Sequence, residues 1–575
     1  MFQRLNFAVY IVLPLIFVQL GKNAVNLMLA KCLSVVSAGL VAVSVSGMVP
    51  SSTAAARDGV PDHHPGFVLG ALEANIRDVL AEGAAKSDVA AYYERHGFAP
   101  VWVGHPERLA ALRSMLARSG EHALPAGAYD AEIITRAETA GQNLSEAAIA
   151  EINVTRLYLQ FARDLNSGLL TPSDVDWEIT LKPRIARADR LLQAVDFAAD
   201  PMDVFDRLVP SDPAYARLVE EKKRLQAIVA SGGWGPKVPA GGVLRPGRKY
   251  KAVPKLRARL AAMGYGDLGS SKHYDETLLM VVKLFQARHG LNSDGVAGPA
   301  TLGALNVSAE RRLDQVVVNM ERLRWLNHER GDRHIFVNLA DFSMKVMDHG
   351  VPSFESRVVI GKTGRDFRTP EFSHVMTHMV INPYWHVPKS IARREYLPLL
   401  KQDPMALANR GMHLYNRRGR ILDTSGADFS EYSESNFPFS IKQPPGSRNA
   451  LGRVKFMFPN KHNIYLHDTP AKKLFFKERR AYSHGCVRVQ RPFDLAFHLL
   501  EPQSNEPEAL FRSILKRRSE KFVYLETPVP VYLSYHSAWV DDMGVPQYRG
   551  DIYRRDSKIL AALKAEGVQI TSLDG

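Results

Sequence analysis

Two short segments carry the side chains best suited to covalent chemistry in this chain, residues 465–470 (YLHDTP) and residues 483–488 (SHGCVR). A thiol attacks only as the thiolate, so Cys486 needs a base or a positive charge beside it. His467 stands at the end of a predicted strand, where it could take the thiol proton and later return it to a leaving amine. The two residues therefore indicate nucleophilic catalysis by a cysteine.

Neighbouring groups could complete such a site. The base needs an acceptor for its other ring nitrogen, and the carbonyl of Asp468, or of a neighbour, is a candidate. Gly485 lets the backbone turn sharply, so the N–H groups of Gly485 and Cys486 could face a developing oxyanion. Arg488, two residues after the cysteine, could bind a substrate carboxylate through two hydrogen bonds.

Two simpler interpretations compete with this one. A single cysteine is often a small buried apolar residue, but His-Gly-Cys between Ser and Arg is a poor core sequence. A zinc site built from His467, Asp468, His484 and Cys486 would match none of the recurring ligand spacings. We therefore predict neither a metal nor another cofactor.

Composition excludes several classes of protein. The 575 residues include 74 Lys and Arg against 60 Asp and Glu, a net charge of +14 that suits an anionic polymer or a membrane surface. We find no basic run interleaved with aromatic residues, and so predict no nucleic-acid partner. The two cysteines, Cys32 and Cys486, exclude a disulfide framework and a multi-cysteine metal cluster.

The first 56 residues have the pattern of an export signal. Apolar runs at 7–20 and 33–49 are followed by the small residues 52–56 (STAAA), which resemble a signal-peptidase site. We predict export to the periplasm and a mature chain that begins near Arg57. Translation starting at Met28, and an uncleaved leader that anchors the chain in the membrane, are the alternatives.

The remaining chain alternates helical and β patterns. Apolar spacings of three and four run from about residue 69 to 228, and alternating branched residues begin at 334. The second helical unit has an expected core of Leu256, Leu260, Val281, Phe285 and Leu302. We divide the chain into a leader (1–56), a helical domain (57–230), a Gly/Pro-rich linker (231–248), a compact helical unit (249–306), a connecting helix (307–333), a β domain (334–500) with a polar insertion at about 392–450, and a C-terminal segment (501–575) that completes the catalytic and helical regions.

The spacing of the chemical residues resembles one enzyme family. His467, fifteen further positions and then SHGCVR are similar to the signature of the L,D-transpeptidase catalytic domain of the YkuD type. The resemblance implies that His467 is the base and Cys486 the nucleophile. It also implies that His484 shapes the site and that Arg488 contacts substrate.

The resemblance extends over residues 85–560. The segments 92–102, 319–325, 382–388 and 535–539 are similar to the large periplasmic YcbB-like subgroup, and residues 249–306 resemble its three-helix peptidoglycan-binding domain. This implies an α+β multidomain protein with a mostly β, sandwich-like catalytic domain. A helical scaffold, the wall-binding domain and a capping lid at 392–450 would accompany it.

The function implied is that of a peptidoglycan L,D-transpeptidase. Cys486 would form a thioester with a tetrapeptide stem and expel D-Ala, and a second stem would resolve the thioester as a 3→3 cross-link. Besides Arg488, the expected substrate-binding residues are Ser483, Tyr465, Asn382, Tyr384 and Trp385, although each aromatic could instead be core packing.

The partners implied are stem peptides and glycan strands, with wall synthases as further candidates, carbapenem β-lactams as inhibitors and a monomeric enzyme. Three alternatives remain open. The same site could act as an L,D-carboxypeptidase with water as acceptor, or attach envelope proteins to peptidoglycan, or the chain could be an inactive wall-binding protein. Whether residues 249–306 bind glycan is also open.

Overall fold

The structure is a computed structural model that describes residues 69–82, 87–141 and 143–570. The leader predicted for residues 1–56 lies outside these ranges. In the part that the structure describes, no helix is both long enough and apolar enough to cross a membrane.

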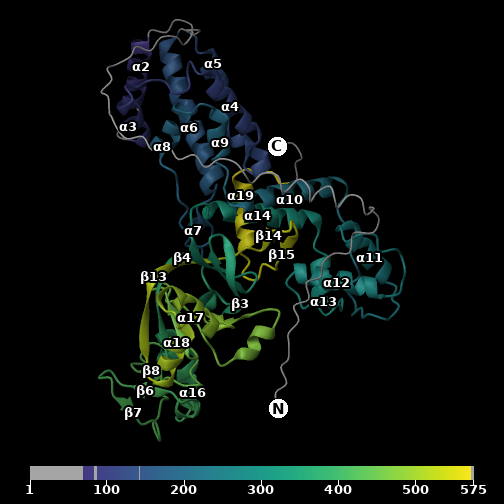
Figure 1. Cartoon of the computed structure of the whole chain (residues 1–575), viewed down its shortest axis with the longest axis vertical. Coiled ribbons are helices and arrows are strands. Elements are labelled where there is room, and N and C mark those ends of the chain that lie inside the picture. Colours follow the sequence, from purple (N-terminus) through teal and green to yellow (C-terminus); the bar gives the residue numbers. More distant parts are fainter. Residues whose placement is uncertain (1–68, 83–86, 142, 571–575) are drawn as a thin grey trace, which may run out of the picture. The chain divides into compact units, whose positions relative to one another are not determined.

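The N-terminal part is helical, as the apolar spacing predicts (Figure 1). Its helices are α2 (Leu69–Glu82), α3 (Asp88–Arg95), α4 (Pro106–Ala117), α5 (Glu132–Thr139), α6 (Leu144–Ser167), α7 (Pro172–Val175), α8 (Ala188–Asp196), α9 (Pro201–Asp206) and α10 (Pro213–Ala230). The long helix α6 supplies much of the buried face, including Leu157, Phe161 and Leu165.

A buried carboxylate holds the turn after α3. Glu151 on α6 accepts the N–H groups of Val101 (2.6 Å), Trp102 (3.0 Å) and Val103 (2.8 Å), and the hydroxyl of Tyr93 (2.5 Å). A buried carboxylate is stable when it accepts several hydrogen bonds, so these contacts compensate for the burial of Glu151. The aromatic residues of segment 92–102 therefore have a structural role here.

The compact helical unit comprises α11 (Val253–Ala262), α12 (Glu276–Arg288) and α13 (Pro299–Leu305). Four of its five expected core residues are fully buried, whereas Val281 lies partly exposed at the edge of the core. The segment 231–248 is no loose linker. Val238 and Leu244 are buried in the core of this unit, and Val238 exchanges two backbone–side-chain hydrogen bonds with Asn306.

The β domain is one sheet that closes on itself. Its strands run in the order β11-β3-β12-β10-β9-β4-β13-β1-β2, and β2 also pairs with β3, which completes a ring. The strands are β1 (Arg333–Asn338), β2 (Ser343–Asp348), β3 (Val351–Gly361), β4 (Phe372–Ile381), β9 (Val454–Met457), β10 (Leu466–His467), β11 (Ala481–Ser483), β12 (Val487–Val489) and β13 (Lys521–Ser534). The inward-facing apolar side chains form its core, to which α17 (Pro492–Leu500) and α18 (Pro507–Lys516) also contribute.

The polar insertion folds as a small unit of its own. It contains the four-stranded sheet β5-β8-β6-β7, and its core includes Leu397, Leu400, Phe437 and Ile441. The elements are β5 (Trp385–His386), α15 (Lys389–Ile391), a π-helical turn (Ala392–Tyr396), α16 (Leu397–Gln402), β6 (His413–Tyr415), β7 (Ile421–Leu422) and β8 (Ser440–Gln443). It therefore begins before residue 392, because β5 already belongs to its sheet.

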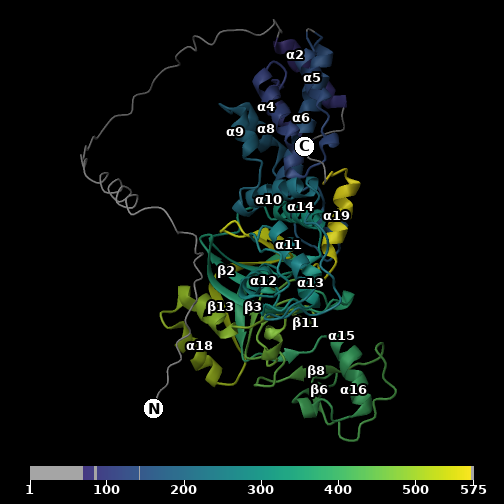
Figure 2. The ribbon, with the colours of Figure 1, turned by 90° about the vertical axis from the view of Figure 1, so that its right-hand side faces the viewer.

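Helix α14 (Ala309–Trp325) packs between α10 and the C-terminal helix α19 (Arg555–Ala565), as both views show (Figures 1 and 2). The hairpin of β14 (Ala538–Val540) and β15 (Pro546–Tyr548) packs against α10 and α14. The C-terminal segment thus supplies β13 to the sheet and α19 to this helical layer.

Candidate active site

The parallel pairing of β10 and β12 sets the geometry of the site. Leu466 stands opposite Val487, and His467 stands opposite Arg488. Leu466 and Val487 are fully buried in the core of the sheet. Successive side chains of a strand point to opposite faces, so His467 and Arg488 lie together on the other face.

Three further side chains belong to that face. Tyr465 and Cys486 each precede a core-facing residue, and the N–H of Val487 donates to the carbonyl of Tyr465 (3.1 Å). On the neighbouring strand β9, Lys455 stands opposite His467. A thiol, a phenol, an imidazole and two cations are thereby gathered on three adjacent strands.

The Cys486 thiol is protonated at neutral pH. Burial raises its pKa to about 11, although hydrogen bonds from Tyr465 and the positive charges of Arg488 and Lys455 oppose the shift. Its Sγ donates to the carbonyl of Asn463 at 3.6 Å. The surrounding cations would stabilise a thiolate once it forms.

His467 is a neutral imidazole with a defined orientation. Its Nδ1 lies 2.5 Å from the carbonyl oxygen of Asp468, which can only accept, so Nδ1 carries the proton and Nε2 is the basic nitrogen. Burial, and then the charge of Arg488, lower its pKa to about 3. Among the described residues no hydrogen bond joins His467 to Cys486. The distance between two such groups often shortens only when substrate binds.

The Asp468 side chain fixes the backbone around this histidine. Its carboxylate accepts the N–H of Arg453 (2.9 Å), the N–H of Thr469 (2.7 Å) and the ammonium of Lys472 (2.6 Å). Gly452 has φ +65°, and a Cβ there would lie 2.3 Å from this carboxylate. Only glycine fits the turn that brings the carboxylate and the β9 strand together.

The loop before Cys486 is held from within. Ser483 is buried, and its hydroxyl donates to the carbonyl of Cys486 (2.5 Å) and accepts the N–H of Gly485 (3.1 Å). Ser483 therefore positions the loop and does not face substrate, contrary to the expectation from the sequence. The Gly485 N–H is likewise already bonded, whereas no described residue accepts the N–H of Cys486.

Arg488 is a cation of the site without a carboxylate partner among the described residues. It is half-buried, burial lowers its pKa, and its Nε has no hydrogen-bond partner within the described ranges. It forms no ion pair with any described carboxylate. Such an arginine can accept an incoming carboxylate without first breaking a bond inside the protein.

A buried chain of polar contacts supports the same loop from behind. The hydroxyl of Thr369, which is fully buried, donates to the carbonyl of Gly485 (2.6 Å) and accepts the N–H of Gly361 (3.0 Å). The carbonyl of Thr369 accepts Nη2 of Arg555 (2.9 Å), whose Nη1 contacts Glu371 (3.2 Å).

That chain ends in helix α14. Glu371 also accepts Arg322 at 2.7 and 2.8 Å, and all of these charged side chains are buried. Segment 319–325 therefore has a structural role, because Arg322 connects α14 to the buried contacts that support the loop before Cys486.

The three residues expected under the lid lie in different surroundings. Asn382 is buried with φ +52°, and its amide donates to the carbonyl of Leu515 (3.0 Å), so it cannot line a cleft. Tyr384 is exposed, and Trp385 packs against the core of the insertion, with its ring 6.3 Å from that of Tyr396. The expectation for Asn382 fails because its amide donates to backbone carbonyls at the end of α18.

The insertion contacts the catalytic motif directly. Glu395 in the π-helical turn forms a short contact with Nε2 of His484, and Arg394 pairs with Asp366 at 2.7 Å. The ring of His484 also packs edge-on against Phe367, at 5.0 Å between centroids. His484 is thus bonded to the insertion and not to His467. No cluster of three potential metal-ligating side chains occurs in the described part of the chain.

The sequence analysis did not predict three residues that support or adjoin the motif, namely Thr369, Lys455 and Glu395. The sequence could have indicated Lys455, because it is a cation inside the otherwise apolar strand segment 454–458. No such sequence pattern marked Thr369 and Glu395, since their partners in the motif, Gly485 and His484, lie 116 and 89 residues away.

Comparison with known proteins agrees with this arrangement. Residues 332–531 match the family described as "L,D-transpeptidase catalytic domain", of the YkuD type. Residues 87–221 match a scaffold domain, and residues 249–305 match a "Putative peptidoglycan binding domain".

One curated relative, named "Putative L,D-transpeptidase" and from Haemophilus influenzae, is 32% identical over 255 residues. The match covers 44% of this chain and 50% of the relative, so the chain spans about half the length of that protein.

Two crystal structures of L,D-transpeptidases also match. The one from Xylanimonas cellulosilytica is 16% identical and covers 52% of this chain and 98% of that one, with a TM-score of 0.15. The one from Stackebrandtia nassauensis is 15% identical, and the match covers 52% of this chain and 96% of that one, with a TM-score of 0.20. At these TM-scores the two structures add nothing to the description of the fold. The three domain matches identify the parts of the chain. It is a multidomain protein with a YkuD-type L,D-transpeptidase catalytic domain, a scaffold domain and a peptidoglycan-binding domain.

Proposed function

We propose that this protein is a peptidoglycan L,D-transpeptidase that forms 3→3 cross-links through a thioester on Cys486. The observation that carries the proposal is the shared sheet face of Tyr465, His467, Cys486 and Arg488, set by the parallel pairing of β10 and β12. The YkuD-type domain match supports the reaction class.

In the first step the sulfur of Cys486 attacks the carbonyl carbon of the third residue of a tetrapeptide stem. The thiol proton passes to Nε2 of His467, which then delivers it to the leaving D-Ala amine as the peptide bond breaks. Because the free thiol and imidazole are both neutral, deprotonation accompanies attack and does not precede it. Arg488 and Lys455 stabilise the negative charge on sulfur, and the Cys486 N–H faces the oxyanion.

In the second step the side-chain amine of another stem attacks the thioester carbon. Nε2 of His467 takes a proton from that amine and returns it to the departing sulfur, which restores the thiol. An amide bond replaces the thioester, so the reaction conserves the energy of the original peptide bond and needs no nucleotide. A carboxylate of the stem binds Arg488, which has no acidic partner among the described residues.

Product analysis by mass spectrometry tests the proposal. A disaccharide-tetrapeptide should give mainly cross-linked dimers with release of D-Ala, and Cys486→Ala should abolish both products. A carbapenem should add one drug mass to the peptide that contains Cys486. Free tripeptide as the only product at high stem concentration would instead identify a carboxypeptidase that uses the same thioester.

The setting follows from the substrate. Peptidoglycan lies outside the cytoplasmic membrane, so we propose an extracytoplasmic, periplasmic enzyme whose leader is removed near Arg57. Stem peptides and glycan strands are its partners, and wall synthases supply the strands. A protein lysine as acceptor is the remaining alternative, and defined acceptors in the same assay would reveal it.

A further inference from the structure

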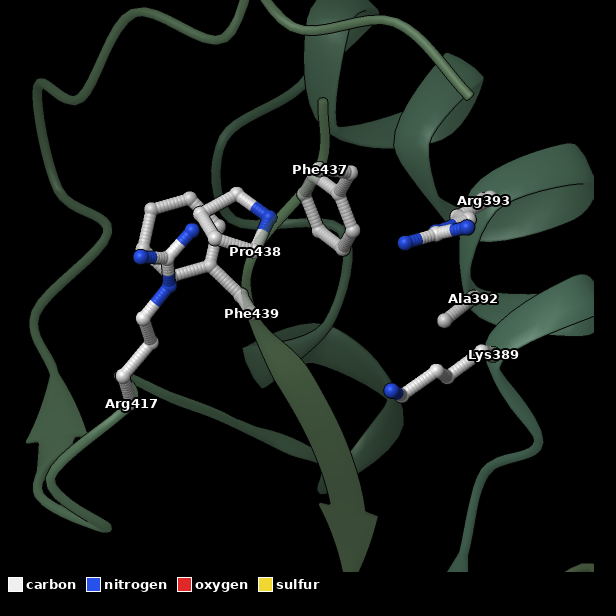
Figure 3. A pocket seen from close by; sticks show the side chains of 7 residues that line it. All are labelled: Lys389, Ala392, Arg393, Arg417, Phe437, Pro438 and Phe439. Atoms are coloured by element: carbon white, nitrogen blue, oxygen red, sulfur yellow. The ribbon is translucent and has the colours of Figure 1, made fainter. Parts of the chain in front are cut away.

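The insertion contains a cationic pocket that the chemistry at Cys486 does not use. A cavity of about 290 Å³ is lined by Lys389, Ala392, Arg393, Arg417, Phe437, Pro438 and Phe439. Figure 3 shows Lys389 and Arg393 extending from the helical side of this cavity toward the wall formed by residues 437–439, with Arg417 beside Pro438 and Phe439.

None of these three cations forms an ion pair within the described ranges of the chain. The neighbouring Arg394, in contrast, is paired with both Asp366 and Glu434. Unpaired cations that line one cavity repel one another, and an anion bound there would relieve that repulsion. The pocket is therefore complementary to a negatively charged ligand.

The π-helical turn connects this pocket to the catalytic motif. Its successive residues Arg393, Arg394 and Glu395 face the cavity, Asp366 and His484 respectively. Arg393 and Glu395 are two residues apart, so their Cα atoms are separated by no more than about 7.6 Å. π-Helical turns are rare and often mark functional sites. An anion bound at Arg393 therefore lies close to the segment that contacts His484.

We propose that this pocket binds a carboxylate of the acyl-acceptor stem peptide. This rests on the proposed function, in which Arg488 beside Cys486 is occupied by the donor stem, so that the acceptor needs a cation elsewhere. A volume of about 290 Å³ holds one or two amino-acid residues and is too small for a long peptide or a glycan strand. The ring of Phe439, which is partly exposed in the cavity wall, packs against the methylene groups that join the carboxylate to the peptide.

The test uses the full chain and separates the two half-reactions. Acylation is followed with a carbapenem, and acceptor use is followed as dimer formed from a tetrapeptide donor and a tripeptide acceptor of varied concentration. Lys389→Gln and Arg393→Gln should each raise the acceptor KM by about 10-fold relative to any change in acylation, the effect of one exposed charge-assisted hydrogen bond. Lys389→Arg should have the wild-type acceptor KM. With an acceptor whose carboxylates are amidated, the Gln variants and the wild type should have the same acceptor KM.

Arg418→Gln is the matched control, because Arg418 is exposed in the same turn as Arg417 but does not line the cavity. An equal rise of KM in Arg418→Gln would mean a general field effect and would overturn the assignment, as would an unchanged KM in Lys389→Gln and Arg393→Gln. Inorganic phosphate that binds the pocket without competing with acceptor would mean a free-anion site and would also overturn it. If carbapenem acylation and D-Ala release are both absent, the proposed function fails. The pocket is then tested by calorimetry, in which the tripeptide should bind the wild type more tightly than Arg393→Gln, and equal binding would overturn the assignment.

Discussion

Thr369→Val should uncouple the catalytic loop from its buried support. Valine keeps the shape of threonine but removes the hydroxyl that bonds the carbonyl of Gly485 and the N–H of Gly361. Both backbone groups would then be buried without a partner. Each such group costs about 1–3 kcal/mol, so the free energy of unfolding should fall by about 2–6 kcal/mol.

The same change should slow acylation of Cys486. The carbonyl of Gly485 belongs to the peptide unit that also contains the Cys486 N–H, so its displacement moves both the sulfur and the oxyanion donor. A misplacement of about 1 Å can cost about 100-fold in rate, and we expect a loss of about 10–100-fold. The measurement is the rate of carbapenem acylation in stopped flow, under conditions where urea titration shows the variant to be folded.

Thr369→Ser is the control, because it keeps the hydroxyl and loses only a buried methyl group, for about 1 kcal/mol. It should retain most of the acylation rate. If Thr369→Val acylates as fast as wild type despite its lower stability, Thr369 supports the fold alone and does not position the nucleophile. A serine variant as slow as the valine variant would show that packing, and not the hydroxyl, sets the rate.

Two more predictions concern the elements around His467. Its pKa is lowered from 6.5 to about 3, so the unfolded chain takes up the proton first. Stability should therefore be full above pH 6.5 and fall toward pH 3, by on the order of 4 kcal/mol from this group. His467→Gln should flatten the pH dependence of the urea midpoint, and an unchanged slope would contradict the assignment. Gly452→Ala should lower the thermal midpoint and the acylation rate because its Cβ would meet the Asp468 carboxylate, whereas Gly446→Ala, in open space, should change neither.

Residue types and spacing were enough to predict the type of catalytic domain and the class of the fold. The pattern 465–470 and 483–488 contains the whole catalytic loop, and strand alternation places its polar members on one face. The match to a YkuD-type catalytic domain and to scaffold and peptidoglycan-binding domains confirms the family resemblance. Local sequence carries this information because the reactive residues are close together along the chain.

The errors share a different cause. Ser483 and Asn382 were expected to contact substrate, but they donate to the backbone carbonyls of Cys486 and Leu515. The N–H of Gly485 was expected to face the oxyanion, but it donates to the hydroxyl of Ser483. The Gly/Pro-rich segment 231–248 was predicted to be a linker, yet three of its apolar side chains, Trp234, Val238 and Leu244, are buried. For Asn382 and for segment 231–248 the deciding partners are distant in sequence, and a single sequence does not contain that pairing. For Ser483 and Gly485 the partners are local, and the conformation of the loop decides which groups are bonded.

The position of Arg555 has a consequence for biosynthesis. The ribosome makes the chain from its N-terminus, so the segment with Cys486 emerges well before α19. Until Arg555 arrives, the carbonyl of Thr369 and the buried carboxylate of Glu371 lack one of their partners. A nascent or truncated chain that ends before α19 would therefore contain every catalytic side chain and still have an unsupported nucleophile loop. A chain truncated before α19 should therefore react more slowly at Cys486 than the full chain, because the carbonyl of Thr369 and the carboxylate of Glu371 lose Arg555.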